Sequence, residues 1–395
     1  MEQNFAYRMN GIKGSAIREM FKLMAQPDMI SFAGGNPSPD TFPADALKEI
    51  SAKLLLENPS ACLQYGITEG YAPLKEKIKN RLIKQGTATE SDEIIITTGG
   101  QQAIDLCAKA LLNPNDGVIC EAPSFIGALN CFRSYEAKLY GVPLCDDGID
   151  IEKLEETIKE NDNIKILYII PTFQNPKGVT TSFEKRKKVL EICKKNNIVI
   201  IEDNPYGELR FKGEDIPTIK SLDTEGKTVM YCGSLSKVLS PGLRIGFGVG
   251  NAELLGKMAV LKQVNDVHTN IFSQMLADKW LEEYDFDAHI DMCKNIYKNK
   301  CELMLSTMDE CFPDFVKYTR PEGGLFIWVD IDRDVDTKEF VKKAIEKKVA
   351  FVPGYTFMTD MEEKTSSFRL NYSTMSDDKI VEGIKILGEL LNTLK

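Results

Sequence analysis

One lysine stands among residue types that can hold an anion and react with a carbonyl. In the segment 231–247, YCGSLSKVLSPGLRIGF, Lys237 follows Ser234 and Ser236 and precedes Arg244. Hydroxyl groups and a planar guanidinium can together bind a phosphate. A lysine that loses its hydration just past a buried strand has a lowered pKa, and its neutral amine can form a Schiff base with a carbonyl. A solvated turn with an ordinary exposed lysine is the alternative interpretation.

Polar residues also follow the other apolar runs of this region. Gly99-Gly100 follows EIIITT, Gln174-Asn175 follows YIIPTF, and Asp203 ends IVIIED. Because ligands of open α/β sheets bind beyond the carboxyl ends of the strands, we expect these residues to share one crevice. Glycines before a helix let backbone N–H groups approach a phosphate, and a carboxylate can pair with the ring nitrogen of pyridoxal phosphate. An ordinary turn and a capping aspartate are the alternatives.

Short apolar runs that alternate with amphipathic, lysine-rich segments must position these residues. Such runs predict a mainly parallel sheet covered on both faces, so we expect a three-layer α/β/α domain over residues 45–285. Residues 286–395 begin with a long helical pattern and continue with strands and helices, typical of a smaller α+β domain. Residues 1–44 are expected to form an arm that packs with the small domain. Thr181 and Glu184 have capping-box spacing before the helical segment 182–197.

Composition disfavours several classes of function. The 395 residues carry a formal net charge of −10, which argues against a nucleic-acid or anionic-membrane partner. No apolar run is long enough to span a bilayer and the chain opens with no signal-peptide core, so a cytoplasmic location is expected. Ten scattered cysteines without a C-x-x-C pair are expected to be reduced and buried. With only two histidines, neither a Ser-His-Asp triad nor a metal site is expected.

Three ordered motifs carry a resemblance to a known family: IIPTFQNPKG, IEDNPYGELRF and GSLSKVLSPGLRIG. With these motifs the chain resembles the fold type I pyridoxal-phosphate aminotransferases of class I/II, and more closely the subgroup of 2-aminoadipate and kynurenine aminotransferases. The resemblance runs from SAIRE and SFAGGNPSPDTFP through LQYGITEGYAPLKEKI to FRLNYS, nearly the whole chain. It implies the pyridoxal-phosphate-dependent transferase fold, that cofactor, and a homodimer with shared active sites.

The resemblance implies catalytic and cofactor-binding roles for the matching residues. Lys237 matches the lysine that carries the cofactor and later moves a proton, and Asp203 matches the partner of the ring nitrogen. Asn175 and Tyr206 match donors to the phenolic oxygen, and Phe125 stands where a ring-stacking tyrosine is common. The implied phosphate-binding residues are Gly100, Gln101, Ser234, Ser236 and Arg244, and Gln102 is expected as a further cofactor-binding residue.

Other matching residues concern the substrate and the second subunit. Arg369 matches the clamp for the substrate α-carboxylate, to which Asn175 also belongs, and Arg18 and Gly35 match N-terminal substrate contacts. Tyr65 matches a tyrosine that reaches the phosphate of the neighbouring subunit. Asn36 stands where the subgroup usually has an apolar residue, which affects side-chain specificity.

The resemblance predicts a ping-pong transaminase that works through Lys237. It is expected to move an amino group between an acidic, aromatic or long aliphatic L-amino acid and a 2-oxo acid, such as 2-oxoglutarate. Another reaction of the same cofactor, β-elimination or decarboxylation, is the alternative, because the cofactor stabilises the carbanion in all of them. A ligand-sensing regulator that joins this fold to a winged-helix DNA-binding domain is disfavoured by the acidic charge and the layout.

Overall fold

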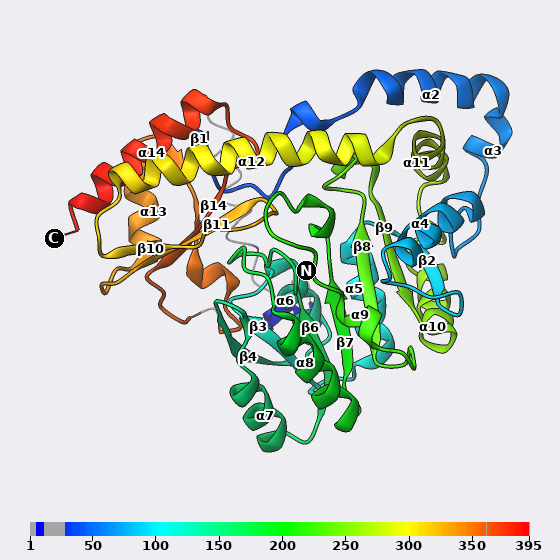
Figure 1. Ribbon diagram of the computed structural model, residues 1–395. Coiled ribbons are helices and arrows are strands. Elements are labelled where there is room, and N and C mark those ends of the chain that lie inside the picture. Colours follow the sequence, from blue (N-terminus) through cyan, green and yellow to red (C-terminus); the bar gives the residue numbers. More distant parts are fainter. Residues whose placement is uncertain (1–4, 12–27, 361, 395) are drawn as a thin grey trace.

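A computed structural model describes residues 5–11, 28–360 and 362–394 (Figure 1). Its large domain is built on an eight-stranded sheet in the order β2-β9-β8-β7-β6-β3-β4-β5. Strands β4, β3, β6, β7 and β8 pair in parallel, whereas β9 runs antiparallel to β8 and β2, and β5 runs antiparallel to β4. The strands in sheet order are Glu93–Thr98, Ile245–Gly250, Val229–Ser234, Val199–Asp203, Ile164–Ile169, Gly117–Ala122, Lys138–Cys145 and Gly148–Ile149.

Helices cover both faces of this sheet. Consecutive strand residues such as Ile200 and Ile201 belong to two different apolar cores, because successive side chains of a strand point to opposite faces. One core is completed by α5 (Gly100–Leu111), α6 (Ile126–Ser134) and α10 (Ala252–Gln263). The other is completed by α7 (Ile151–Glu160), α8 (Phe183–Lys195) and α9 (Ile219–Leu222). The predicted three-layer domain with a mainly parallel sheet is confirmed.

Further helices join the large sheet to a small domain. Helices α2 (Ala44–Glu57), α3 (Pro59–Leu63), α4 (Ala72–Lys84) and α11 (Ile271–Glu283) precede α12 (Phe286–Cys311), which runs along the molecule toward the small sheet (Figure 1). We placed the domain boundary at 285/286, where α12 begins, and that boundary stays a prediction.

The small domain is built on an antiparallel sheet in the order β10-β11-β14-β13. Helices α13 (Thr337–Glu346) and α14 (Asp377–Asn392) belong to it. The N-terminal segment is joined to this region, because β1 (Ile30–Ser31) pairs in parallel with β12 (Val349–Ala350). The four strands in sheet order are Val316–Tyr318, Phe326–Ile331, Ser367–Asn371 and Val352–Pro353.

One local prediction is wrong. Helix α8 is capped by Ser182, whose hydroxyl accepts a hydrogen bond from the Lys185 N–H, and not by Thr181. The backbone N–H of Thr181 donates to the Pro171 carbonyl, and this contact holds Thr181 in the preceding buried segment. The helix therefore begins one residue later than the capping-box spacing indicated.

Eight of the ten cysteines are buried, and all ten are free thiols. Within residues 5–11, 28–360 and 362–394, no helix combines the length and the apolar character that crossing a bilayer requires.

Candidate active site

The carboxyl ends of the central strands bring the predicted residues to one edge of the sheet. Strand β7 ends at Asp203 and β8 ends at Ser234, and the two strands pair in parallel with Asp203 opposite Cys232. Strand β2 ends at Thr98, next to the start of β9 at Ile245. Parallel strands end at the same edge, so the segments that follow β2, β7 and β8 meet there.

Lys237 lies half-buried at this edge without an acidic partner at bonding distance. Its Nζ donates to the carbonyl of Gly35 at 2.7 Å and lies 6.0 Å from the centre of the Tyr206 ring. Burial, followed by the charges of Arg369 and Arg244, lowers the pKa of Lys237 from 10.5 to about 8. A substantial fraction of this amine is therefore neutral near pH 8, which a nucleophilic lysine requires.

The carboxylate of Asp203 is buried and accepts a hydrogen bond from the Tyr168 hydroxyl at 2.7 Å. Burial raises the pKa of Asp203 to about 6, and the Tyr168 hydrogen bond opposes that rise. The carboxyl group is thus ionised at neutral pH although it is buried. Sequence reasoning missed Tyr168, because a tyrosine inside the apolar run IKILYI has the pattern of a core residue.

Arg369 is buried but has no carboxylate partner among the described residues. Its guanidinium donates to the Asn175 side-chain oxygen at 2.8 Å and to the Ala33 carbonyl at 2.7 Å, and its Nε has no partner. The rings of Phe326 and Phe357 lie 4.2 Å and 5.0 Å from it. Burial lowers the pKa of Arg369 to about 10. A buried guanidinium with an unused N–H is suited to receive an anion.

The turn between β2 and α5 forms a cradle for a second anion. Gly99 has a positive φ of 78° and precedes the first helical residue, Gly100, so the helix begins with free backbone donors. A Cβ at Gly99 would overlap the Arg244 guanidinium, and a Cβ at Gly246 would overlap the Gly99–Gly100 backbone. A Cβ at Gly100 would lie 3.8 Å from that of Ser234. The glycines therefore let Arg244, Ser234 and the helix end approach one point.

The two glutamines of this turn lie in different environments. Gln101 donates to the Gly127 carbonyl at 3.0 Å, and Gly127 also contacts the ring of Phe125, so Gln101 and Phe125 lie together. The Gln102 side chain bonds to protein partners at both polar ends, and its backbone N–H donates to the Gly99 carbonyl. The N–H donors of Gln102 therefore bond to protein acceptors, which differs from the cofactor contact predicted for Gln102.

The residues predicted for substrate and partner contacts are only partly brought together. Gly35 meets Lys237 through its carbonyl, and the backbone oxygen of the exposed Asn36 accepts from the Ser373 hydroxyl. Tyr65 lies outside the cluster, 81% exposed, with its ring edge against His268. Arg18 lies outside the described residues.

A second buried carboxyl group, Glu121, was missed because it lies inside the mostly apolar run GVICEA. It accepts from the Ile170 N–H at 3.0 Å and from the Gln174 side chain at 3.2 Å. Burial raises the pKa of Glu121 to about 8. Gln174 also donates to the Pro123 carbonyl at 2.8 Å, so this buried pair supports the segment that carries Asn175.

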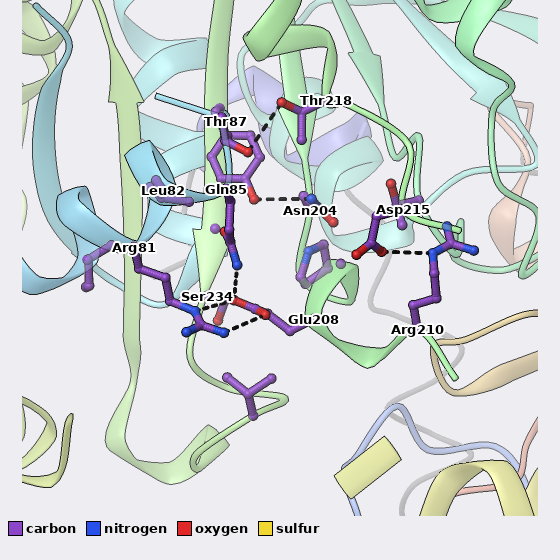
Figure 2. Close-up of a pocket in the computed structure, with 18 of the residues that line it drawn as sticks. Arg81, Leu82, Gln85, Thr87, Asn204, Glu208, Arg210, Asp215, Thr218 and Ser234 are labelled. Atoms are coloured by element: carbon purple, nitrogen blue, oxygen red, sulfur yellow. Dashed lines mark hydrogen bonds and ion pairs between the residues drawn. The ribbon is translucent and has the colours of Figure 1, made fainter. Parts of the chain in front are cut away.

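A separate cavity of about 1130 Å³ lies beside α4 and the segment after β7. Figure 2 shows that Arg81 and Gln85 both point toward Glu208, while Arg210 points toward Asp215. Ser234 lines this cavity, but Lys237, Asp203 and Arg369 do not. Since its arginines are paired with carboxylates, we place the reactive site at Lys237 rather than here.

Comparison with known proteins agrees with this geometry. The family model for aminotransferase class I and II matches residues 27–387. The chain belongs to the class I and II aminotransferases. Aromatic-amino-acid aminotransferase 1 of Thermococcus litoralis is 41% identical over 99% of this chain and 94% of its own length. The 2-aminoadipate transaminase of Thermus thermophilus is 38% identical, over 97% of this chain and 95% of its own.

A solved structure shows the same fold. The crystal structure of Pyrococcus horikoshii kynurenine aminotransferase in complex with PMP superposes with a TM-score of 0.95 at 40% identity, covering 99% of this chain and 98% of that one. The family, the fold, the transaminase class and the cofactor, pyridoxal phosphate, predicted from the sequence are confirmed.

The residues of this aminotransferase fit its cofactor. The Gly99–Gly100 cradle with Arg244 suits a phosphate, the buried carboxylate of Asp203 suits a cationic ring nitrogen, and the Lys237 amine suits an aldehyde. Neither Arg244 nor Lys237 has an ion-pair partner within the ranges that the structure describes. The roles of the individual side chains remain predictions.

Proposed function

We propose that this aminotransferase accepts acidic, aromatic and long aliphatic L-amino acids and uses 2-oxoglutarate as the amino acceptor. The observation that carries the proposal is Arg369, a buried guanidinium with an unused Nε that lies close to two phenylalanine rings. An arginine in this setting holds the α-carboxylate that every amino acid has, whereas the rings of Phe326 and Phe357 offer apolar surface. The relatives named for aromatic amino acids and 2-aminoadipate support a broad donor range.

The side chains divide the catalytic work. When bound, pyridoxal phosphate supplies an electron-withdrawing ring that stabilises a carbanion at the substrate Cα. Arg369 orients the substrate by its carboxylate, which selects the Cα bond that breaks. Lys237, neutral in part near pH 8, takes up the Cα proton and returns a proton to the product. Asp203 holds the positive charge of the ring nitrogen, while Asn175 and Tyr206 lie beside Arg369 as donors.

Exposed apolar side chains support a homodimer with shared active sites. Leu56, Leu63, Tyr65, Ile67 and Val264 are each between 67% and 83% exposed. Such a group of exposed apolar residues is typical of a surface that another chain covers. In the proposed dimer a second copy of this chain covers these residues, and Tyr65 contacts the partner's phosphate site. All ten cysteines are free, which supports a cytoplasmic location.

The substrate range is tested with purified protein, 2-oxoglutarate and a panel of amino acids. Glutamate formation measures transamination, whereas release of ammonia with pyruvate measures β-elimination. Arg369→Ala is expected to lower kcat/KM for every donor, and Arg18→Ala for dicarboxylic donors more than for phenylalanine. If glutamate forms from one class of donor only, the broad range is wrong. If Arg18→Ala lowers kcat/KM equally for 2-aminoadipate and phenylalanine, Arg18 does not bind the distal carboxylate.

A further inference from the structure

A buried lysine lies directly behind the predicted phosphate cradle. Lys262, in the last turn of α10, is 0% exposed. Its Nζ lies 2.8 Å from the Gln102 side-chain oxygen, 2.8 and 2.9 Å from the two oxygens of Asp266, and 3.0 Å from the Thr269 hydroxyl. A buried ammonium is stable only when it is paired and hydrogen-bonded, and Lys262 satisfies both conditions.

Hydrogen bonds of Gln102 and Thr98 connect the groups around Lys262 to the cradle. The Gln102 oxygen accepts from the Thr98 backbone N–H at 2.8 Å, and its amide donates to Asp266 at 2.8 Å. The Thr98 hydroxyl donates to Asp266 at 2.8 Å. Thr98 and Gln102 flank Gly99, Gly100 and Gln101, so the two ends of the turn are fixed to one ion pair.

The cluster also shapes the segment that contacts Tyr65. The carbonyl of Lys262 accepts from the N–H groups of residues 265, 266 and 267. This winding includes Val267 at a φ of 65°, a conformation that a β-branched residue adopts only where its surroundings impose it. His268 follows, and its ring accepts from the Gly66 N–H and meets the edge of Tyr65.

We propose that one cluster positions both the phosphate cradle and the segment of Tyr65 and Gly66 that contacts His268. This Lys262 cluster consists of Thr98, Gln102, Lys262, Asp266 and Thr269. Its members are positioning residues, because their side chains are joined to one another by hydrogen bonds. Lys262 and Asp266 neutralise each other, so the cluster adds rigidity rather than net charge to the cradle. The proposal rests on the proposed function, with the cofactor phosphate bound at the Gly99–Gly100 cradle.

Two variants and a matched control test the cluster. Lys262→Met removes the ammonium, and Gln102→Leu cuts the link to Thr98 while it leaves the Lys262–Asp266 pair intact, so folding is retained. Lys220→Met is the control, because the Lys220 side chain is also buried and forms an ion pair with Asp92 at 2.6 Å. Asp92 precedes β2, whose other end carries the cradle, and six strand residues place the two sites about 20 Å apart.

The measurement is the Kd of each apoprotein for pyridoxal phosphate and for pyridoxal, which lacks the phosphate. Lys262→Met and Gln102→Leu are expected to raise the Kd for pyridoxal phosphate about tenfold and the Kd for pyridoxal less than twofold. A tenfold change corresponds to the loss of one charge-assisted hydrogen-bond network. Lys220→Met should lower the melting temperature and leave both constants within twofold. If the cluster only stabilises the fold, the variants weaken the binding of both ligands equally or of neither, and either result overturns the proposal.

Arg244→Ala separates this proposal from the one on which it rests. If Arg244→Ala leaves the Kd for pyridoxal phosphate unchanged, the phosphate does not bind at this cradle, and both proposals fail. If Arg244→Ala weakens pyridoxal phosphate selectively while Lys262→Met and Gln102→Leu do not, the cradle is correct and the positioning role of the cluster is wrong.

Discussion

The pH at which Lys237 captures the cofactor aldehyde tests the electrostatics of the site. An amine attacks an aldehyde only in its neutral form. Burial and the charges of Arg369 and Arg244 lower the pKa of Lys237 from 10.5 to about 8. At pH 7, a pKa of 8 leaves roughly 10% of the amine neutral, whereas a pKa of 10.5 leaves roughly 0.03%. The shift therefore accelerates capture at pH 7 by about 300-fold.

The assay is stopped-flow absorbance of apoprotein mixed with pyridoxal phosphate between pH 6 and pH 10.5. Each rate is divided by that of Nα-acetyl-lysine at the same pH, which removes the titration of the cofactor itself. The ratio should be constant below about pH 8, because both amines lose protons at the same rate per pH unit there. Above about pH 8 the ratio should fall about tenfold per pH unit, because Lys237 is already neutral while Nα-acetyl-lysine continues to lose protons. Arg369→Met removes the second-largest cause of the shift and should move the break upward.

Arg210→Met is the matched control. Arg210 is also buried, 8% exposed against 4% for Arg369, and also lies over a phenylalanine ring. It pairs with Asp215 and Glu322 and is not among the charges that shift the pKa of Lys237. A ratio that stays constant to pH 10.5 refutes the shifted amine. An equal displacement of the break by both arginine variants refutes the electrostatic role of Arg369.

Three further predictions concern neighbouring groups. Tyr168→Phe removes a hydrogen bond that lowers the pKa of Asp203, so that pKa should rise above about 6. The fall of kcat on the acid side of its pH profile should then move to higher pH. An unchanged profile contradicts the effect of Tyr168 on Asp203. Arg369→Lys keeps the charge but loses the planar fork, and should lower kcat/KM about 10²-fold for every amino acid in steady-state assays. Tyr65→Phe should weaken cofactor retention by about 1 kcal/mol, one hydrogen bond, in a dimer verified by light scattering; a fully active monomer excludes the shared site.

The sheet could be predicted because its signals are local. Uniformly apolar runs such as IVIIED and TVMYCGS form β7 and β8, and the polar residues after them meet at one edge. Strand β4 was not predicted, because KLYGVPLC mixes buried with exposed residues and contains a proline. At the edge of the parallel part of a sheet, a strand with one exposed face lacks the continuous apolar run on which the prediction relied.

The supporting side chains of the site could not be predicted, because their partners are distant in sequence. Tyr168 bonds to Asp203 across 35 residues, and Lys262 bonds to Gln102 across 160. No local pattern encodes such pairs. Residue type also misled: Gln102 adjoins the glycines of the cradle, which suggested a ligand contact, but its polar ends face the Lys262 cluster instead.

Two buried lysines and the half-buried Lys237 show how the fold separates a reactive amine from structural ones. Lys220 and Lys262 each bond to a carboxylate, at 2.6 Å from Asp92 and 2.8 Å from Asp266. Burial lowers the pKa of Lys262, and Asp266 opposes that effect. At Lys237 burial acts in the same direction, but two guanidiniums add to it, and the bonded partner is a backbone carbonyl. Lys220 and Lys262 each bond to a carboxylate and support the fold, whereas Lys237, with a pKa of about 8, can release its proton at a pH where enzymes work. Burial together with the arrangement of neighbouring charges therefore distinguishes Lys237 from the structural lysines.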